Sequence, residues 1–125
     1  MAAPTTVTIA MLSEAARKSF LVANVAAPAD GDVIELCPYA PAAFTVTAVR
    51  VKTYADDIDV AFQTQGGTMT FSGTITATDG ALADYTPTGV NTVTAGGKLT
   101  FSLSNSSGTP AGLVIQVDIT YDEAL

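Results

Sequence analysis

Residues 98–125 read KLTFSLSNSSGTPAGLVIQVDITYDEAL, and this stretch decides the fold class. Leu99, Phe101 and Leu103 alternate with small polar residues, and residues 113–121 continue the pattern. An apolar residue at every second position is typical of a β-strand that buries one face and turns the other to solvent or an interface. Residues 104–112 are rich in Gly, Pro and Ser and form a loop between the two runs. We therefore expect a hairpin of two strands that contributes one face to a core.

The same alternation recurs through most of the chain and predicts an all-β protein. Residues 54–57 read as a tight hairpin turn, and the glycine-containing stretches 65–67 and 95–97 read as further turns. Seven to nine short strands imply a two-sheet antiparallel β-sandwich, for which jelly-roll and immunoglobulin-like strand orders both remain open. The other expected strands lie at residues 6–11, 20–25, 33–37, 44–54, 58–63, 68–71 and 74–77.

One of these runs, residues 44–54, changes its parity part-way. The residues on one parity are Phe44, Val46 and Ala48, and those on the other are Val49 and Val51. An extra residue in one strand of a pair moves the following side chains to the opposite face. The pattern therefore predicts a β-bulge or a twist between Thr47 and Arg50.

Residues 13–20, SEAARKSF, are the stretch with a helical pattern. Ser13 suits an N-cap, and the order of Glu14 first and Arg17 and Lys18 last suits the helix dipole. At about two turns such a helix depends on packing. We expect at most one short N-terminal helix.

The length and composition indicate a single sandwich domain over residues 1–125. A chain of 125 residues has the usual size of one domain, and 48% hydrophobic residues suffice for an ordinary core. Charged residues make up only 14%, against a typical value of about 25%. A surface of small neutral residues is suited to packing against other subunits.

The net charge of −7 argues against a nucleic-acid partner. The five basic residues form no run, and a phosphate backbone repels an acidic protein. No apolar run approaches the roughly 20 residues of a membrane span, so we expect no membrane partner. Residues 1–20 lack the basic-then-apolar order of a signal peptide, which predicts a protein that is made and kept in the cytoplasm.

The sequence offers little for catalysis, and we expect no enzyme and no cofactor. Histidine is absent, which removes the usual general base and the commonest zinc ligand. Cys37 is the single cysteine and reads as a small buried hydrophobe. Turn and surface roles are favoured over a structural Ca²⁺ site or a glycosidase pair for the clustered carboxylates. These are Asp56, Asp57 and Asp59 in one cluster and Asp118, Asp122 and Glu123 in the other, with Asp59 and Asp118 at outward strand positions.

The first twelve residues, MAAPTTVTIAML, form a possible N-terminal arm. The expected sheet edges carry few of the lysines that usually prevent edge strands from pairing with other chains. This favours an edge that is covered by a neighbouring subunit. The arm can pair with its own sheet or add as a strand to a partner, and both alternatives remain open. The candidate interface residues are Val7, Ile9, Met11 and Leu12.

Residues 60–80 and 91–124 resemble small β-sandwich virion structural proteins of tailed bacteriophages, of the capsid decoration, cement or fibre type. The resemblance rests on an Ala-Gly-Gly turn, an alternating strand, a small-residue loop and a closing alternating strand, in VTAGGKLTFSLSNSSGTPAGLVIQVDITY. It implies a capsid decoration or cement protein on the virion surface, bound to the major capsid protein. It also implies assembly in the host cytoplasm and association of identical subunits as a homotrimer, and it supplies no catalytic residues.

Two other functions remain open. A fibre or spike module that binds a host receptor would use the loops at residues 37–43, 54–57 and 81–89. A tail component would assemble as a ring of six subunits.

Overall fold

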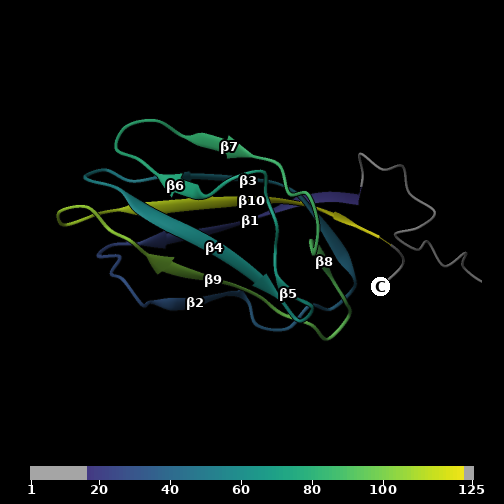
Figure 1. Ribbon diagram of the computed structural model, residues 1–125. Coiled ribbons are helices and arrows are strands. Elements are labelled where there is room, and N and C mark those ends of the chain that lie inside the picture. Colours follow the sequence, from purple (N-terminus) through teal and green to yellow (C-terminus); the bar gives the residue numbers. More distant parts are fainter. Residues whose placement is uncertain (1–16, 123–125) are drawn as a thin grey trace, which may run out of the picture.

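The computed structural model describes residues 17–122, which form two antiparallel β-sheets packed face to face (Figure 1). The first sheet has the order β1–β10–β3–β7, and β8 also pairs with β3. The second has the order β2–β9–β4–β5, and β6 also pairs with β4. The strands are β1 (Lys18–Val25), β2 (Val33–Cys37), β3 (Phe44–Lys52), β4 (Ile58–Thr64), β5 (Gly67–Thr68), β6 (Ile75–Ala77), β7 (Ala83–Tyr85), β8 (Thr92–Val93), β9 (Leu99–Ser104) and β10 (Leu113–Tyr121). The all-β sandwich expected from the sequence is confirmed.

The strand order is that of a jelly roll. Consecutive strands from β1 to β4 lie in alternate sheets, and so do β9 and β10. An immunoglobulin-like sandwich instead keeps its first two strands in one sheet. The alternation of sheets therefore decides between the two orders that the sequence left open.

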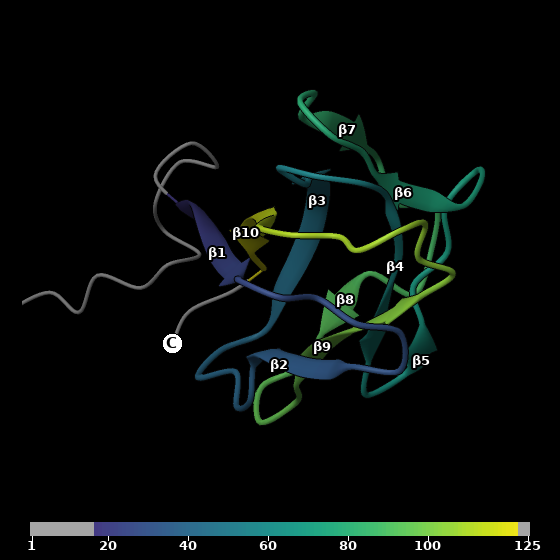
Figure 2. The same cartoon turned by 90° about the vertical axis from the view of Figure 1, so that its left-hand side faces the viewer.

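The hairpin expected at residues 98–125 is wrong, because its two strands do not pair with each other. Strand β9 pairs with β2 and β4, whereas β10 pairs with β1 and β3 in the other sheet. Residues 105–112 thus cross from one sheet to the other, at the end of the sandwich that faces the viewer in Figure 2. The turn expected at residues 54–57 likewise joins β3 and β4 of different sheets. Alternation fixes which face of a strand is inward, but it does not say which strand lies beside it.

The helix expected at residues 13–20 is also wrong for its last three residues, because Lys18 to Phe20 belong to β1. Residues 13–16 of that segment and the strand expected at residues 6–11 lie outside the described residues. No α-helix occurs in residues 17–122, and no helix there is long and apolar enough to cross a membrane.

The β-bulge predicted in β3 is confirmed. Asp118 pairs with Ala48 and Ile119 pairs with Val46, so Thr47 has no partner on β10. The side chains before the bulge at positions 44 and 46 are buried, and so are those after it at positions 49 and 51. Thr47 itself is exposed.

The core lies between the sheets and is made by the inward side chains of the central strands. Phe62 is fully buried and packs against Phe101 and Phe71, with ring centroids 6.1 and 6.3 Å apart. Removing these rings from water is a principal stabilising term of such a fold. The largest fully buried side chains are Phe44, Phe62, Phe101, Ile58, Leu99, Leu103, Leu113, Ile115, Val46, Val49, Val51 and Val93.

Carboxylates fix the crossing loop between β9 and β10. Asp30 accepts hydrogen bonds from the backbone N–H of Ser106 (2.8 Å) and from its hydroxyl (3.0 Å). Asp56 accepts a hydrogen bond from the backbone N–H of Thr109 at 2.9 Å. These bonds satisfy backbone donors that a loop would otherwise leave to water. The turn role predicted for Asp56 is confirmed.

Gly112, at the end of this loop, gives the first prediction. Its φ is +66°, and a Cβ added there would lie 2.5 Å from Cδ2 of Tyr54. Substitution Gly112→Ala is expected to lower the free energy of unfolding by about 1–3 kcal/mol, because a side chain there meets both strain and a clash. Chemical denaturation measures this. Gly73→Ala is the control, since an added Cβ there meets nothing within 4 Å; equal stabilities of the two variants would contradict the prediction.

Candidate protein-binding surface

The interface residues predicted from the sequence, Val7, Ile9, Met11 and Leu12, lie outside the described residues. The structure therefore neither places them nor tests the arm. A different surface stands out in the described chain, namely the solvent-facing side of the first sheet, which we call the outer face. Its members are Lys18, Phe20, Val22 and Asn24 of β1, Val114, Gln116, Asp118 and Thr120 of β10, Thr45, Thr47, Ala48, Arg50 and Lys52 of β3, and Asp84 of β7.

The strand register brings distant residues side by side on the outer face. Val22, Gln116 and Arg50 form one row across β1, β10 and β3. Asp84 of β7 extends that row, because it pairs with Arg50. Polar and apolar side chains from four strands therefore share one surface.

An ion-pair network holds the centre of the outer face. The Arg50 guanidinium donates a hydrogen bond of 2.6 Å to Oδ2 of Asp118, and its Nε lies 3.6 Å from Asp84. Gln116 donates to the other oxygen of Asp118 at 3.2 Å. The hydrogen bond to Asp118 raises the pKa of Arg50, helped by the charges of Asp118 and Asp84 against partial burial. This network fixes the side chains in one arrangement.

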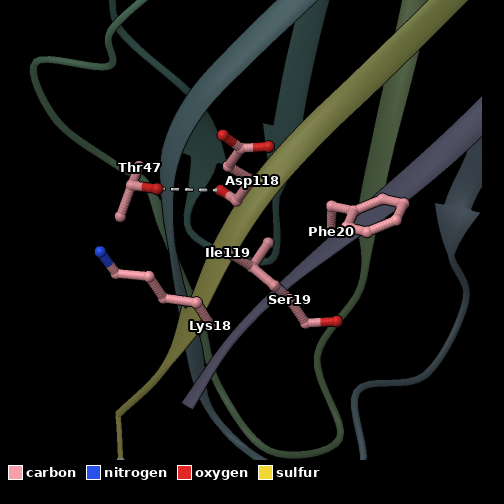
Figure 3. Close-up of a pocket in the computed structure, with 6 residues that line it drawn as sticks. All are labelled: Lys18, Ser19, Phe20, Thr47, Asp118 and Ile119. Atoms are coloured by element: carbon pink, nitrogen blue, oxygen red, sulfur yellow. Dashed lines mark hydrogen bonds between the residues drawn. The ribbon is translucent and has the colours of Figure 1, made fainter. Parts of the chain in front are cut away.

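Apolar side chains lie beside this network on β1. Phe20 is 62% exposed and Val22 is 49% exposed, whereas most exposed strand residues are small or polar. A shallow hollow of about 310 Å³ opens next to Phe20, and Figure 3 shows Thr47 and Phe20 on either side of Asp118. The Thr47 hydroxyl donates to the backbone oxygen of Asp118 at 3.3 Å. The lining residues are Lys18, Ser19, Phe20, Thr47, Asp118 and Ile119.

The outer face is also where the positive charge of this acidic chain collects. Of the five basic residues in the sequence, Lys18, Arg50 and Lys52 lie on it. Asp84 and Asp118 lie on it as well, and so does the carboxylate of Asp122, which accepts a hydrogen bond of 2.6 Å from Thr45. With three positive and three negative groups the face is formally neutral, while the whole chain carries −7. Exposed apolar side chains that are surrounded by positively and negatively charged side chains are typical of a protein-binding surface.

Asp59 and Asp118 of the two carboxylate clusters are engaged by internal donors, and Glu123 lies outside the described residues. Asp59 accepts hydrogen bonds from Thr76 (2.6 Å) and Asn105 (3.1 Å), and Asp118 is paired with Arg50. Residues 17–122 contain no group of three or more side chains placed to hold a metal ion. Cys37 is free and half-buried against the core.

The exposed Tyr54 ring is covered in part by its neighbours. The Lys52 ammonium lies 4.5 Å from the ring centroid, and Gly112 lies close to Cδ2. A cation over the ring is itself a favourable contact. Tyr54 therefore has less free ring surface for stacking a ligand than its exposure alone suggests.

Sequence reasoning did not single out the outer face, although a signal was present. Residues 20–23, FLVA, are apolar without a polar residue between them. Such a run in a strand indicates apolar side chains on both faces. The outward position predicted for Asp118 is confirmed, but the sequence gives no sign of its pairing with Arg50, 68 positions away.

Comparisons with known proteins show the fold. No protein-family model and no curated protein match the chain. A chain of the cyanophage Pam1 capsid asymmetric unit is similar, with a TM-score of 0.56 and 17% identity over 83% of each chain. The CBM36-1 domain of a multidomain xylanase from the hindgut metagenome of Trinervitermes trinervoides gives 0.51 and 16%, over 78% of this chain and 95% of that one. The nucleoplasmin-like N-terminal domain of Drosophila FKBP39 gives 0.48 and 10%, over 86% and 92%.

The ion pair at the centre of the outer face gives the second prediction. Burial alone would raise the pKa of Asp118, but hydrogen bonds from Arg50 and Gln116 and the charge of Arg50 outweigh it and hold that pKa below its ordinary 3.8. A carboxyl group with a lowered pKa in the folded state stabilises the fold at pH values above its ordinary pKa. This contribution is lost as the pH falls from the ordinary pKa through the lowered pKa. Arg50→Gln is expected to raise the pKa of Asp118 toward its ordinary value, so that this pH-dependent contribution to stability becomes smaller.

Carbon-13 NMR titration of the Asp118 carboxyl measures this shift. Lys98→Gln removes the same charge outside the outer face and should leave the Asp118 titration unchanged. An Asp118 titration that is identical in Arg50→Gln and in the unmodified protein would show that the ion pair does not act as described.

Proposed function

We propose that this chain is a non-enzymatic structural protein of a virion that binds the outside of the capsid as a decoration or cement protein. The observation that supports the proposal is the similarity to a chain of the cyanophage Pam1 capsid asymmetric unit. Because the alignment covers 83% of both chains, the two are of about the same length. A single domain of this fold and size is thus a constituent of that asymmetric unit, which favours the head over a fibre or tail.

The physical character of the chain suits a mechanical role. Its two sheets form a rigid body, and crossing loops are held by carboxylate hydrogen bonds at one end. A rigid domain that contacts several capsid protein copies opposes their separation under the pressure of packaged DNA. Several weak contacts made at once give an avidity gain of roughly 10²–10⁴.

The partner in this proposal is the major capsid protein, and the outer face is the contact. It combines exposed Phe20 and Val22 with a fixed polar network and with most of the chain's positive charge. Such a surface fits a partner that presents apolar and acidic groups. Residues 1–12 form a second element of the contact, and a homotrimer is the association of identical subunits that the resemblance implies.

Cosedimentation with capsids of the virus that encodes this chain tests the proposal and gives the third prediction. The unmodified protein should pellet with capsids. Lys18→Glu, which reverses a charge on the outer face, should weaken binding about ten-fold, because opposite charges across an interface would become like charges. Lys98→Glu makes the same change in net charge outside the outer face and should bind as the unmodified protein does.

A failure of the unmodified protein to pellet would contradict capsid binding. Equal weakening by Lys18→Glu and Lys98→Glu would retain capsid binding but would contradict the assignment of the outer face.

Deletion of residues 1–12 gives the fourth prediction. The shortened chain should keep its fold, because the described core draws only on residues 17–122. It should lose most of its capsid binding, since one of two contact elements is gone. Circular dichroism measures the fold, and cosedimentation measures the binding. Full retention of binding would contradict a role of residues 1–12 in the capsid contact.

A fibre or spike module that binds a host glycan is the alternative that one observation favours. The similarity to a CBM36-1 domain has a TM-score of 0.51, close to that of the capsid chain. Tyr39, which is 70% exposed, is the most accessible tyrosine for stacking on a sugar. Binding on a glycan array that is lost in Tyr39→Ala, with no binding to capsids, would favour this alternative.

A further inference from the structure

Within residues 17–122, one edge of the first sheet is formed by β1, and it differs from every other sheet edge there. Strand β1 has eight residues and pairs there on one side only, with β10, in an unbroken register. The edge strands β5, β6, β7 and β8 have two or three residues each. Strand β2 has five residues and a register shift between Glu35 and Cys37. Short or irregular strands block edge pairing, whereas β1 offers a long regular row of backbone groups.

The inward apolar side chains of β1 and β2 are less buried than those of the central strand β10. The inward side chains of the central strand β10, from Leu113 to Ile119, are at most 2% exposed. Leu21 and Ala23 of β1 and Ile34 and Leu36 of β2 pack against the core but are only partly buried. Strands β1 and β2 are edge strands of the two sheets, and they lie on the same side of the sandwich (Figure 2).

We propose that two copies of this chain pair through their β1 strands, antiparallel and about a two-fold axis, with Leu21 of one copy opposite Leu21 of the other. An antiparallel pair of this length forms about eight backbone hydrogen bonds. It joins the two first sheets into one continuous sheet and brings the partly buried Leu21 and Ala23 of each copy next to those of the other. A two-fold axis is the commonest symmetry of soluble oligomers. For the isolated chain this dimer takes the place of the homotrimer that the resemblance implies.

The sequence of β1 is self-complementary in this register. Phe20 lies opposite Val22 of the second copy, and Lys18 lies opposite Asn24. An aromatic residue opposite a β-branched one is a favourable cross-strand pair, and no like charges oppose each other.

The two neighbouring registers that keep both outer faces on the same side of the joined sheet are less favourable. A shift by two residues in one direction places Phe20 opposite Phe20 and moves Asn24 opposite Ala16, which precedes β1, so the paired segment becomes shorter. The shift in the other direction places Phe20 opposite Asn24 and Lys18 opposite Ala26, which follows β1. Both shifts remove the two pairs of an aromatic with a β-branched residue. The register centred on Leu21 keeps these pairs and is the one we propose.

This pairing does not depend on capsid binding, so the isolated chain can test it and gives the fifth prediction. Sedimentation velocity across a concentration series should show a dimer of the full chain. The double variant Phe20→Lys and Val22→Lys should weaken dimerisation roughly ten-fold or more, because lysines then oppose lysines across the axis. The matched control, Leu82→Lys with Val90→Lys, also changes two exposed apolar residues to lysine, but away from β1, and should remain dimeric.

Disulfide trapping tests the register in a Cys37→Ser background. Lys18→Cys protein mixed with Asn24→Cys protein should form a disulfide-linked heterodimer under mild oxidation, since the two positions are directly opposite. Either variant alone should not crosslink, because two copies of position 18 would be about 20 Å apart, whereas a disulfide needs Cα atoms within about 7 Å. Both positions are exposed, so folding should be retained, and circular dichroism checks it.

Several results would overturn the proposal. One is a monomer at every concentration, and another is a trimer or hexamer that the two lysines on β1 leave unchanged. Crosslinking of Lys18→Cys with itself would exclude the register. Dimerisation that appears only after deletion of residues 1–12 would overturn the proposal for the full chain, because the edge of β1 would then be covered in it.

Discussion

Strand β3 must bury side chains of both parities, and the bulge at Thr47 is what allows it. Phe44 and Val46 enter the core before the bulge, and residues 49 and 51 enter it afterwards. In a regular strand that buried Phe44, every second residue after it would point inward as well, including Arg50 and Lys52. Two cations would then lie in the core without partners, at a large cost in free energy. The one unpaired residue thus keeps the core apolar and places Arg50 on the outer face, where it meets its acidic partner on β10.

The inward and outward sides of the strands were predictable from the sequence, and the pairing of strands was not. The alternation in residues 98–121 identifies the buried residues of β9 and β10, and the change of parity in residues 44–54 predicts the bulge. Both are local properties of the chain. The neighbours of β9 and β10 are set by contacts with β1 to β4, far away in the sequence, so the same pattern fits a hairpin and a crossing loop equally well.

The candidate surface shows the same limit. Asp118 could be assigned to an exposed face from its position in an alternating strand, but its partner Arg50 depends on the register between β3 and β10. The apolar run at residues 20–23 indicated side chains on both faces of β1, but only the strand order makes β1 an edge. An exposed apolar residue on an edge strand is available to a partner in a way that one on a central strand is not.

The register between β1 and β10 has a practical consequence for the ends of the described chain. Lys18 pairs with Thr120, and Arg17 donates a hydrogen bond to the backbone oxygen of Tyr121 at 2.9 Å. The described chain therefore enters and leaves the sandwich at one pole, opposite the pole of the carboxylate-held loop (Figure 1). A short linker can join residue 122 to residue 17, so the domain is suited to circular permutation. Peptides fused directly to residue 17 or residue 122 would emerge together from that pole.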